Sequence, residues 1–124
     1  TARGAEKALE AGASGIVVSN HGGRVLDHCP ATAEVLPDIV DAVGGKMTIF
    51  VDGAIRSGMD MFKALALGAD AVLIGRPFVT TIYGGGEEGV QLYVQKLKAE
   101  LADTMRMCGA HSLADIDRRM LYGF

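Results

Sequence analysis

Three short apolar runs constrain the fold of this chain more than any other feature. They span residues 15–19, 48–52 and 71–75, and each is continuous rather than alternating and ends in a polar residue or a glycine. Strands that are buried on both faces have this pattern, and they occur mainly in the parallel sheets of α/β proteins. The runs therefore predict three parallel strands.

Helical patterns lie before, between and after these runs. Pro37 is compatible with the second helix only if it falls in the first turn. The fourth helix carries an apolar stripe that predicts core packing, made of Val90, Val94, Leu97, Leu101 and Met105. The expected helices span residues 1–11, 32–43, 58–67 and about 87–107, with a last short helix that starts near Ser112.

The order of these elements is typical of a repeating (β/α) architecture. The segments 8–16 and 64–72 resemble each other in helix end, glycine cap and strand start, so the same helix-to-strand turn is used twice. A right-handed βαβ series fits either an open doubly wound sheet or part of a (β/α)8 barrel. A complete barrel takes about 250 residues, and this chain has 124, enough for a single domain.

Composition excludes several classes of protein. A net charge of -3 argues against a general binder of nucleic acid or anionic membranes, and no run approaches the ~18 apolar residues of a membrane span. Cys29 and Cys108 lack metal-ligand spacing and are expected to be buried free thiols, so we expect no metal site. The six methionines are expected to pack in the core.

The ends of the second and third runs predict a phosphate-binding site. They read 52–58, with Asp52, Gly53, Ala54 and Arg56, and 75–77, with Gly75 and Arg76. Glycine lets backbone amides approach an anion closely, the helix that begins after Ser57 adds partial positive charge, and arginine makes charge-assisted contacts. The alternative is that the glycines only form turns and both arginines are solvated. The matched positions at two strand ends favour the phosphate site.

The end of the first run combines a base and a cation. In the hexapeptide 19–24, His21 and Arg24 lie three residues apart on a glycine-rich loop. Imidazole takes up a proton near neutral pH, and guanidinium binds carboxylates. The other two histidines, His28 and His111, have no such neighbours and are interpreted as structural.

The segment 19–27, followed by Pro30 and Ala31, closely resembles the signature of the FMN-dependent 2-hydroxy-acid oxidase/dehydrogenase family. The segments 52–58, 64–69 and 75–77 also match its pattern. The resemblance covers essentially all of the chain and implies the last three βα units of the family's (β/α)8 TIM barrel, a single partial-barrel FMN-binding domain over residues 1–124.

The resemblance also implies roles for the site residues. His21 would be the active-site base and Arg24 the ligand of the substrate carboxylate. Ser19 would lie against the flavin, and the FMN ribityl-phosphate would be held by Asp52, Gly53, Ala54, Arg56, Gly75 and Arg76. Ala54 departs from the family, which usually has a second glycine there. The implied reaction oxidises a 2-hydroxy acid to a 2-keto acid and passes two electrons to the flavin.

Two other functions stay open. The chain starts without methionine and lacks the family's N-terminal half, so we expect either a fragment that needs the missing half of the barrel or a half-barrel that forms a homo-oligomer. In the second case it would bind FMN or phosphate without catalysis. Another phosphate-binding barrel enzyme, such as a nucleotide dehydrogenase, would not explain His21 with Arg24. The last residues, 121–124, do not resemble a peroxisomal signal, which favours a cytoplasmic location.

Overall fold

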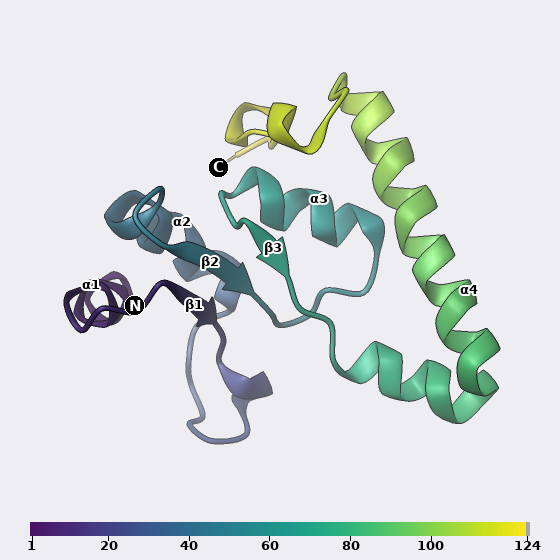
Figure 1. Cartoon of the computed structure of the whole chain (residues 1–124), viewed down its shortest axis with the longest axis horizontal. Coiled ribbons are helices and arrows are strands. Elements are labelled where there is room, and N and C mark those ends of the chain that lie inside the picture. The colour runs from purple at the N-terminus through teal and green to yellow at the C-terminus, as the bar shows by residue number, and fades with distance from the viewer. Residues whose placement is uncertain (124) are drawn as a thin grey trace.

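The computed structural model describes residues 1–123 and contains a three-stranded parallel sheet (Figure 1). Strands β1 (Gly15–Val18), β2 (Thr48–Val51) and β3 (Ala71–Val72) pair in the order β1-β2-β3. The prediction of three parallel strands is therefore confirmed. Each strand ends earlier than the sequence predicts: Ser19, Asp52 and residues 73–75 lie outside the strands, although the amides of Asp52 and Leu73 still donate to the carbonyls of Val18 and Val51.

Four α-helices accompany the sheet, and three of them lie close to their predicted ranges. They are α1 (Ala2–Glu10), α2 (Thr32–Val43), α3 (Gly58–Ala66) and α4 (Arg76–Cys108), followed by the 3-10 turns Leu113–Asp115 and Arg118–Met120. A further 3-10 turn, His21–Gly23, follows β1.

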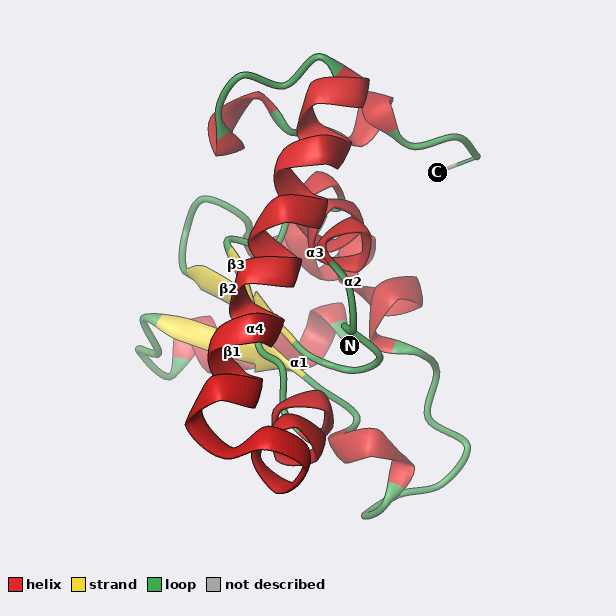
Figure 2. Cartoon of the chain, turned by 90° about the vertical axis from the view of Figure 1, so that its right-hand side faces the viewer, coloured by secondary structure: helices red, strands yellow, loops and turns green. Residues whose placement is uncertain are grey.

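Helix α4 differs from its prediction because it begins at Arg76 rather than near residue 87. Its path breaks at Gly86, where φ 55° and ψ -137° are accessible to glycine but not to ordinary residues. Three consecutive glycines, 84–86, disfavour a helix locally, which explains why the sequence places the start after them. Figure 2 shows α4 extending along the whole length of the molecule.

The core lies between one face of the sheet and the helices. Ile49 and Val51 of the central strand are almost completely buried, and Val18 of β1 lies in the register row of Val51. They pack against buried residues of α2 and α3, among them Leu36, Ile39, Val43 and Ala64, and against Leu67 just after α3. A second cluster joins α3 to α4 and to the C-terminal turns through Phe62, Ala66, Leu101, Met105, Ala110 and Ile116.

The opposite face of the sheet is uncovered. Val17 of β1 pairs in register with Phe50 of β2, and Val17 is 49 % exposed while Leu73, just after β3, is 42 % exposed. The strands are therefore apolar on both faces, but the helices of this chain cover only one of them. This is the face that would point into the interior of a closed barrel.

Several sequence expectations about buried side chains were wrong. Cys29 is half-buried and Cys108 is exposed, so neither is a buried thiol. Met107 is 88 % exposed, because it lies on the opposite side of α4 from Met105, which packs against the second cluster, and Met59 is exposed as well. In the predicted stripe of α4, Leu97 is buried but Val94 is exposed, since only the C-terminal half of the helix lies against the second cluster.

Pro37 lies inside α2, beyond the first turn that begins at Thr32, contrary to the sequence expectation. Its side chain is buried next to Leu36, so packing offsets the loss of one helical hydrogen bond. No helix within residues 1–123 combines the length and the apolar character that crossing a membrane requires.

Replacing Leu36 by alanine should lower the free energy of unfolding by about 2–5 kcal/mol, because it opens a cavity between α2 and the sheet. Leu36 is completely buried, whereas Leu92 on α4 is exposed. The matched variant Leu92→Ala should therefore change stability by less than about 0.5 kcal/mol. Chemical denaturation measures both, and equal losses would contradict this assignment of the core.

Candidate functional site

The loops that follow the three strands converge on one open cleft of about 170 Å³. Each loop contributes predicted site residues: His21 and Arg24 after β1, the 52–56 segment after β2, and Gly75 with Arg76 after β3. The structure thus brings together His21, Arg24, Asp52, Gly53, Ala54, Arg56, Gly75 and Arg76. Gly22, Ile55, Leu73, Ile74 and Pro77, which the sequence did not single out, complete the lining.

Ser19 is the predicted site residue that lies outside this cleft. It lines a neighbouring hollow of about 320 Å³ that runs along β1 and includes Ile16, Val17 and Thr32. Its hydroxyl oxygen accepts a hydrogen bond from the amide of His21 at 3.1 Å. Ser19 therefore holds the main chain of the histidine loop from the side.

The loop after β1 forms a tight turn that fixes His21. His21 itself has a positive φ of 53°, and Gly22 and Gly23 follow with positive φ. Asn20 stabilises this turn in two ways: its Oδ1 accepts from the amide of Gly22 at 3.0 Å, and its Nδ2 donates to the carbonyl of Pro30 at 3.3 Å. This role of Asn20 was not predicted from the sequence, although the residue lies inside the hexapeptide 19–24.

Contact between the first and third loops depends on Gly22. A Cβ atom at Gly22 would lie 3.0 Å from a terminal nitrogen of Arg76. The absence of a side chain therefore lets the Arg76 guanidinium lie against the histidine loop. Arg24 stays local, with its Nε donating to the carbonyl of His21 at 3.4 Å.

The loop after β2 carries the backbone that could hold an anion. Gly53 has φ 94°, and a Cβ there would lie 2.9 Å from the hydroxyl of Thr32, which donates to the carbonyl of Asp52 at 2.6 Å. Ala54 also has a positive φ, 60°, a conformation that costs a non-glycine residue about 1–2 kcal/mol. A glycine at position 54 would adopt this conformation without strain.

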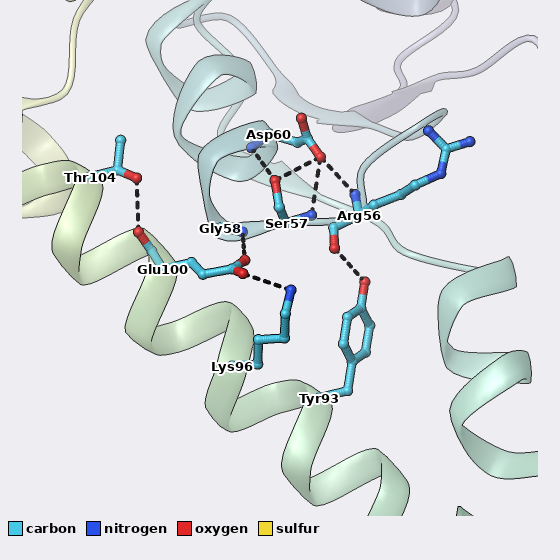
Figure 3. Close-up of polar contacts among 8 residues, drawn as sticks. All are labelled: Arg56, Ser57, Gly58, Asp60, Tyr93, Lys96, Glu100 and Thr104. Carbon is cyan, nitrogen blue, oxygen red and sulfur yellow. Dashed lines mark hydrogen bonds and ion pairs between the residues drawn. The ribbon is translucent and has the colours of Figure 1, made fainter. Parts of the chain in front are cut away.

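The helix N-terminus at the cleft belongs to α4 and not to α3. The sequence pattern predicts that the start of α3 contributes, but Ser57 and Gly58 do not line the cleft. The first amides of α3 are already paired: Ser57 donates to Asp60, and Gly58 donates to Glu100 Oε2 at 2.8 Å (Figure 3). The residues that open α4, Gly75, Arg76 and Pro77, lie in the cleft instead.

The charge of the cleft is predominantly positive. Arg24, Arg56 and Arg76 line it with the single carboxylate of Asp52, and none of the ion pairs found in residues 1–123 includes any of these four groups. Glycine-rich backbone, a helix N-terminus and guanidinium groups outside these ion pairs form the donor set that a phosphate dianion requires. Over the same residues, no group of three or more His, Cys, Asp or Glu is placed to hold a metal ion.

Comparison with known proteins identifies the family. The sequence pattern of the FMN-dependent dehydrogenase family matches residues 1–123, and the chain belongs to this family. A peroxisomal (S)-2-hydroxyacid oxidase from Arabidopsis thaliana is 50% identical over 118 residues, which are 95% of this chain and 32% of that protein. An L-lactate oxidase from Roseobacter sp. (strain GAI101) is 49% identical over 120 residues, 97% of this chain and 32% of the relative.

Solved structures agree with the sequence relatives. A mandelate oxidase variant with a monooxide FMN adduct superposes with a TM-score of 0.92 at 46% identity, over 95% of this chain and 38% of that one. The predicted family and the predicted partial (β/α)8 barrel are thereby confirmed. The chain spans about a third of the length of the curated relatives it matches.

Replacing Ala54 by glycine should raise the free energy of unfolding by about 0.5 to 1 kcal/mol, because relief of the strained φ exceeds the entropy that glycine adds to the unfolded chain. The matched variant Ala99→Gly lies on the exposed side of α4. It should lower stability by about 0.5 to 1 kcal/mol. Chemical denaturation measures the change in the free energy of unfolding of both variants. A destabilised Ala54→Gly would show that the positive φ at position 54 is not strained.

Acid should weaken the attachment of α3 to α4. The Lys96 ammonium, at 2.6 Å, and the amide of Gly58 lower the pKa of Glu100 below its ordinary value of 4.5. A carboxyl whose pKa is lower in the folded state stabilises the fold above its unfolded pKa, and this stability is lost as the pH falls through the folded pKa. We therefore expect the melting temperature of Glu100→Gln to fall less between about pH 6 and pH 3 than that of the unaltered protein.

Part of the acid sensitivity should remain in that variant. The pKa of Asp115 is lowered by the amide and hydroxyl of Ser112, and that of Asp117 by the Arg119 guanidinium. Glu88→Gln removes one exposed carboxylate from α4 as a charge control and should retain the original slope. If Glu100→Gln and Glu88→Gln gave the same pH profile, the ion pair would have no part in the acid response.

Proposed function

We propose that this chain supplies the phosphate-binding and proton-transfer side of a flavin-dependent enzyme that oxidises small 2-hydroxy acids to 2-keto acids. The observation that carries the proposal is that a base and a carboxylate-binding cation, His21 and Arg24, line the same cleft as the cationic, glycine-rich loops of Arg56 and Arg76. The relatives named as 2-hydroxyacid and L-lactate oxidases support the substrate class.

The cofactor of the proposal is FMN. Its phosphate fits the backbone at Gly53 and Gly75, which carry no side chain, and the guanidinium groups of Arg56 and Arg76. Its ribityl hydroxyls fit the carboxylate of Asp52. Ala54 contributes its backbone to the same loop, and Ser19 would lie on the flavin side of β1. When bound, FMN supplies the redox chemistry by accepting two electrons.

The residues of the first loop would do the remaining chemistry. Arg24 would pair with the substrate carboxylate and so fix the orientation of the carbon that is oxidised. His21 would remove a proton, either from the 2-hydroxyl group or from Cα. The tight turn held by Asn20 and Ser19 keeps the imidazole and the guanidinium on one side of the cleft.

The proposed partners follow from the uncovered face of the sheet. Val17 and Leu73 are exposed there, and three strands cannot close a barrel. We propose that the remaining strands of the barrel, or a second copy of the chain, cover this face. The same exposed face favours the second candidate function, a half-barrel that binds FMN or phosphate without catalysis and self-associates. A cytoplasmic location stays a prediction.

Addition of lactate or glycolate without oxygen should bleach the visible absorption of FMN bound to the protein that carries this sequence. His21→Gln should retain the bound flavin but slow bleaching by at least about 100-fold, the contribution of a general base. Stopped-flow absorbance measures the rate, and the fluorescence of released FMN measures retention.

The matched control is His28→Gln, which alters an exposed histidine outside the cleft. It should bleach at the original rate. Bound flavin that stays oxidised with every 2-hydroxy acid tested would favour the noncatalytic half-barrel. Equal slowing in the two histidine variants would remove His21 from its proposed role.

A further inference from the structure

The main chain of Arg56 is held at both of its polar groups by side chains from two helices. Its amide donates to Asp60 Oδ2 of α3 at 3.1 Å, and its carbonyl accepts from the hydroxyl of Tyr93 of α4 at 2.9 Å (Figure 3). The Arg56 guanidinium is left to line the cleft. The backbone from which this cation extends is therefore fixed from outside the site.

Tyr93 links the two loops of the phosphate site. Its ring packs edge-to-face on Phe78, with ring centroids 5.1 Å apart and an interplanar angle of 73°. Phe78 lies in the first turn of α4, directly after Arg76 and Pro77. One side chain thus contacts the Arg56 loop through its hydroxyl and the Arg76 turn through its ring.

The protonation state of Tyr93 suits this role. Burial raises the pKa of its phenol above the ordinary 10.0, so the hydroxyl remains a donor throughout the physiological range. The groups that face it are Lys96 and Glu100 on its own helix and Arg56 and Asp60 on the neighbouring loop and helix.

Glu100 fixes the other end of the same loop. Its carboxylate accepts from the amide of Gly58 at 2.8 Å and is paired with Lys96 at 2.6 Å. A Cβ atom at Gly58 would lie 2.2 Å from the backbone nitrogen of Leu101, so α3 begins directly against α4. Residues 56–58 are therefore held by two side chains of one helix, Tyr93 and Glu100 (Figure 3).

We propose that Tyr93 and Glu100 are positioning residues for the phosphate site: they hold the 56–58 backbone so that Arg56 and Arg76 face one phosphate group together. This inference rests on the proposed function, because it takes FMN as the ligand of the cleft. Neither residue contacts the ligand itself, since neither lines the cleft.

The test compares FMN with riboflavin, which has the same ring and ribityl chain but no phosphate. Tyr93→Phe keeps the ring on Phe78 and removes only the hydroxyl. In the protein that carries this sequence, it should raise the dissociation constant for FMN about fivefold, the effect of one net hydrogen bond, and leave that for riboflavin unchanged. Glu100→Ala should act in the same direction, and Glu100→Gln, which retains an acceptor for Gly58, should restore most of the FMN affinity.

Two controls separate positioning from general loss of structure. Thr104→Val removes a hydrogen bond to the carbonyl of Glu100 within α4, and Tyr83→Phe removes the hydroxyl of an exposed tyrosine. Both should bind FMN and riboflavin as the unaltered protein does. Quenching of flavin fluorescence measures all the constants.

The outcomes are distinguishable. An unchanged FMN constant in Tyr93→Phe, or an equal weakening of FMN and riboflavin, overturns the positioning role while the proposed function stands. If the unaltered protein binds FMN no more tightly than riboflavin, the phosphate site itself is refuted and both proposals fall together.

Discussion

Burial of alternate side chains on the central strand is the constraint on which the rest of the structure depends. Ile49 and Val51 of β2 are almost completely buried under α2 and α3, and Val18 of β1 joins them. A slip of one residue would turn these side chains to the uncovered face, so their burial fixes the register of the three parallel strands. The carboxyl ends of the strands then meet at one edge, where three separate loops form one cleft.

Backbone conformation, more than side-chain packing, shapes that cleft. His21 and Ala54 have positive φ although neither is a glycine, and Gly22 leaves room for the Arg76 guanidinium. The side-chain oxygens of Ser19 and Asn20, which accept from loop amides, and the hydroxyl of Thr32, which donates to the carbonyl of Asp52, hold the first two loops in these conformations. A strained backbone conformation persists only where contacts with neighbouring residues enforce it, and such conformations cluster at functional sites. The backbone from which the cleft side chains extend is therefore held by contacts within the chain itself.

The chain also carries surface that it does not itself bury. One face of the sheet is apolar and open, although the other face is covered by helices and α4 packs on α3 through the second cluster. The family relatives are about three times as long as this chain. A cationic cleft on one edge and an uncovered apolar face beside it are what one segment of a larger closed sheet would present.

The local pattern of the sequence determined the strands, most helix bounds, the family and eight of the residues that line the cleft, because each depends on neighbours within a few positions. Periodicity placed α2 over 32–43 as observed, and the hexapeptide 19–24 singled out His21 and Arg24. Only the tertiary structure decided which helix N-terminus reaches the cleft, because the first amide of α3, that of Gly58, donates to Glu100 on a helix far along the chain. The same holds for Tyr93 and Arg56, whose contact spans 37 positions and leaves no local signal in the sequence.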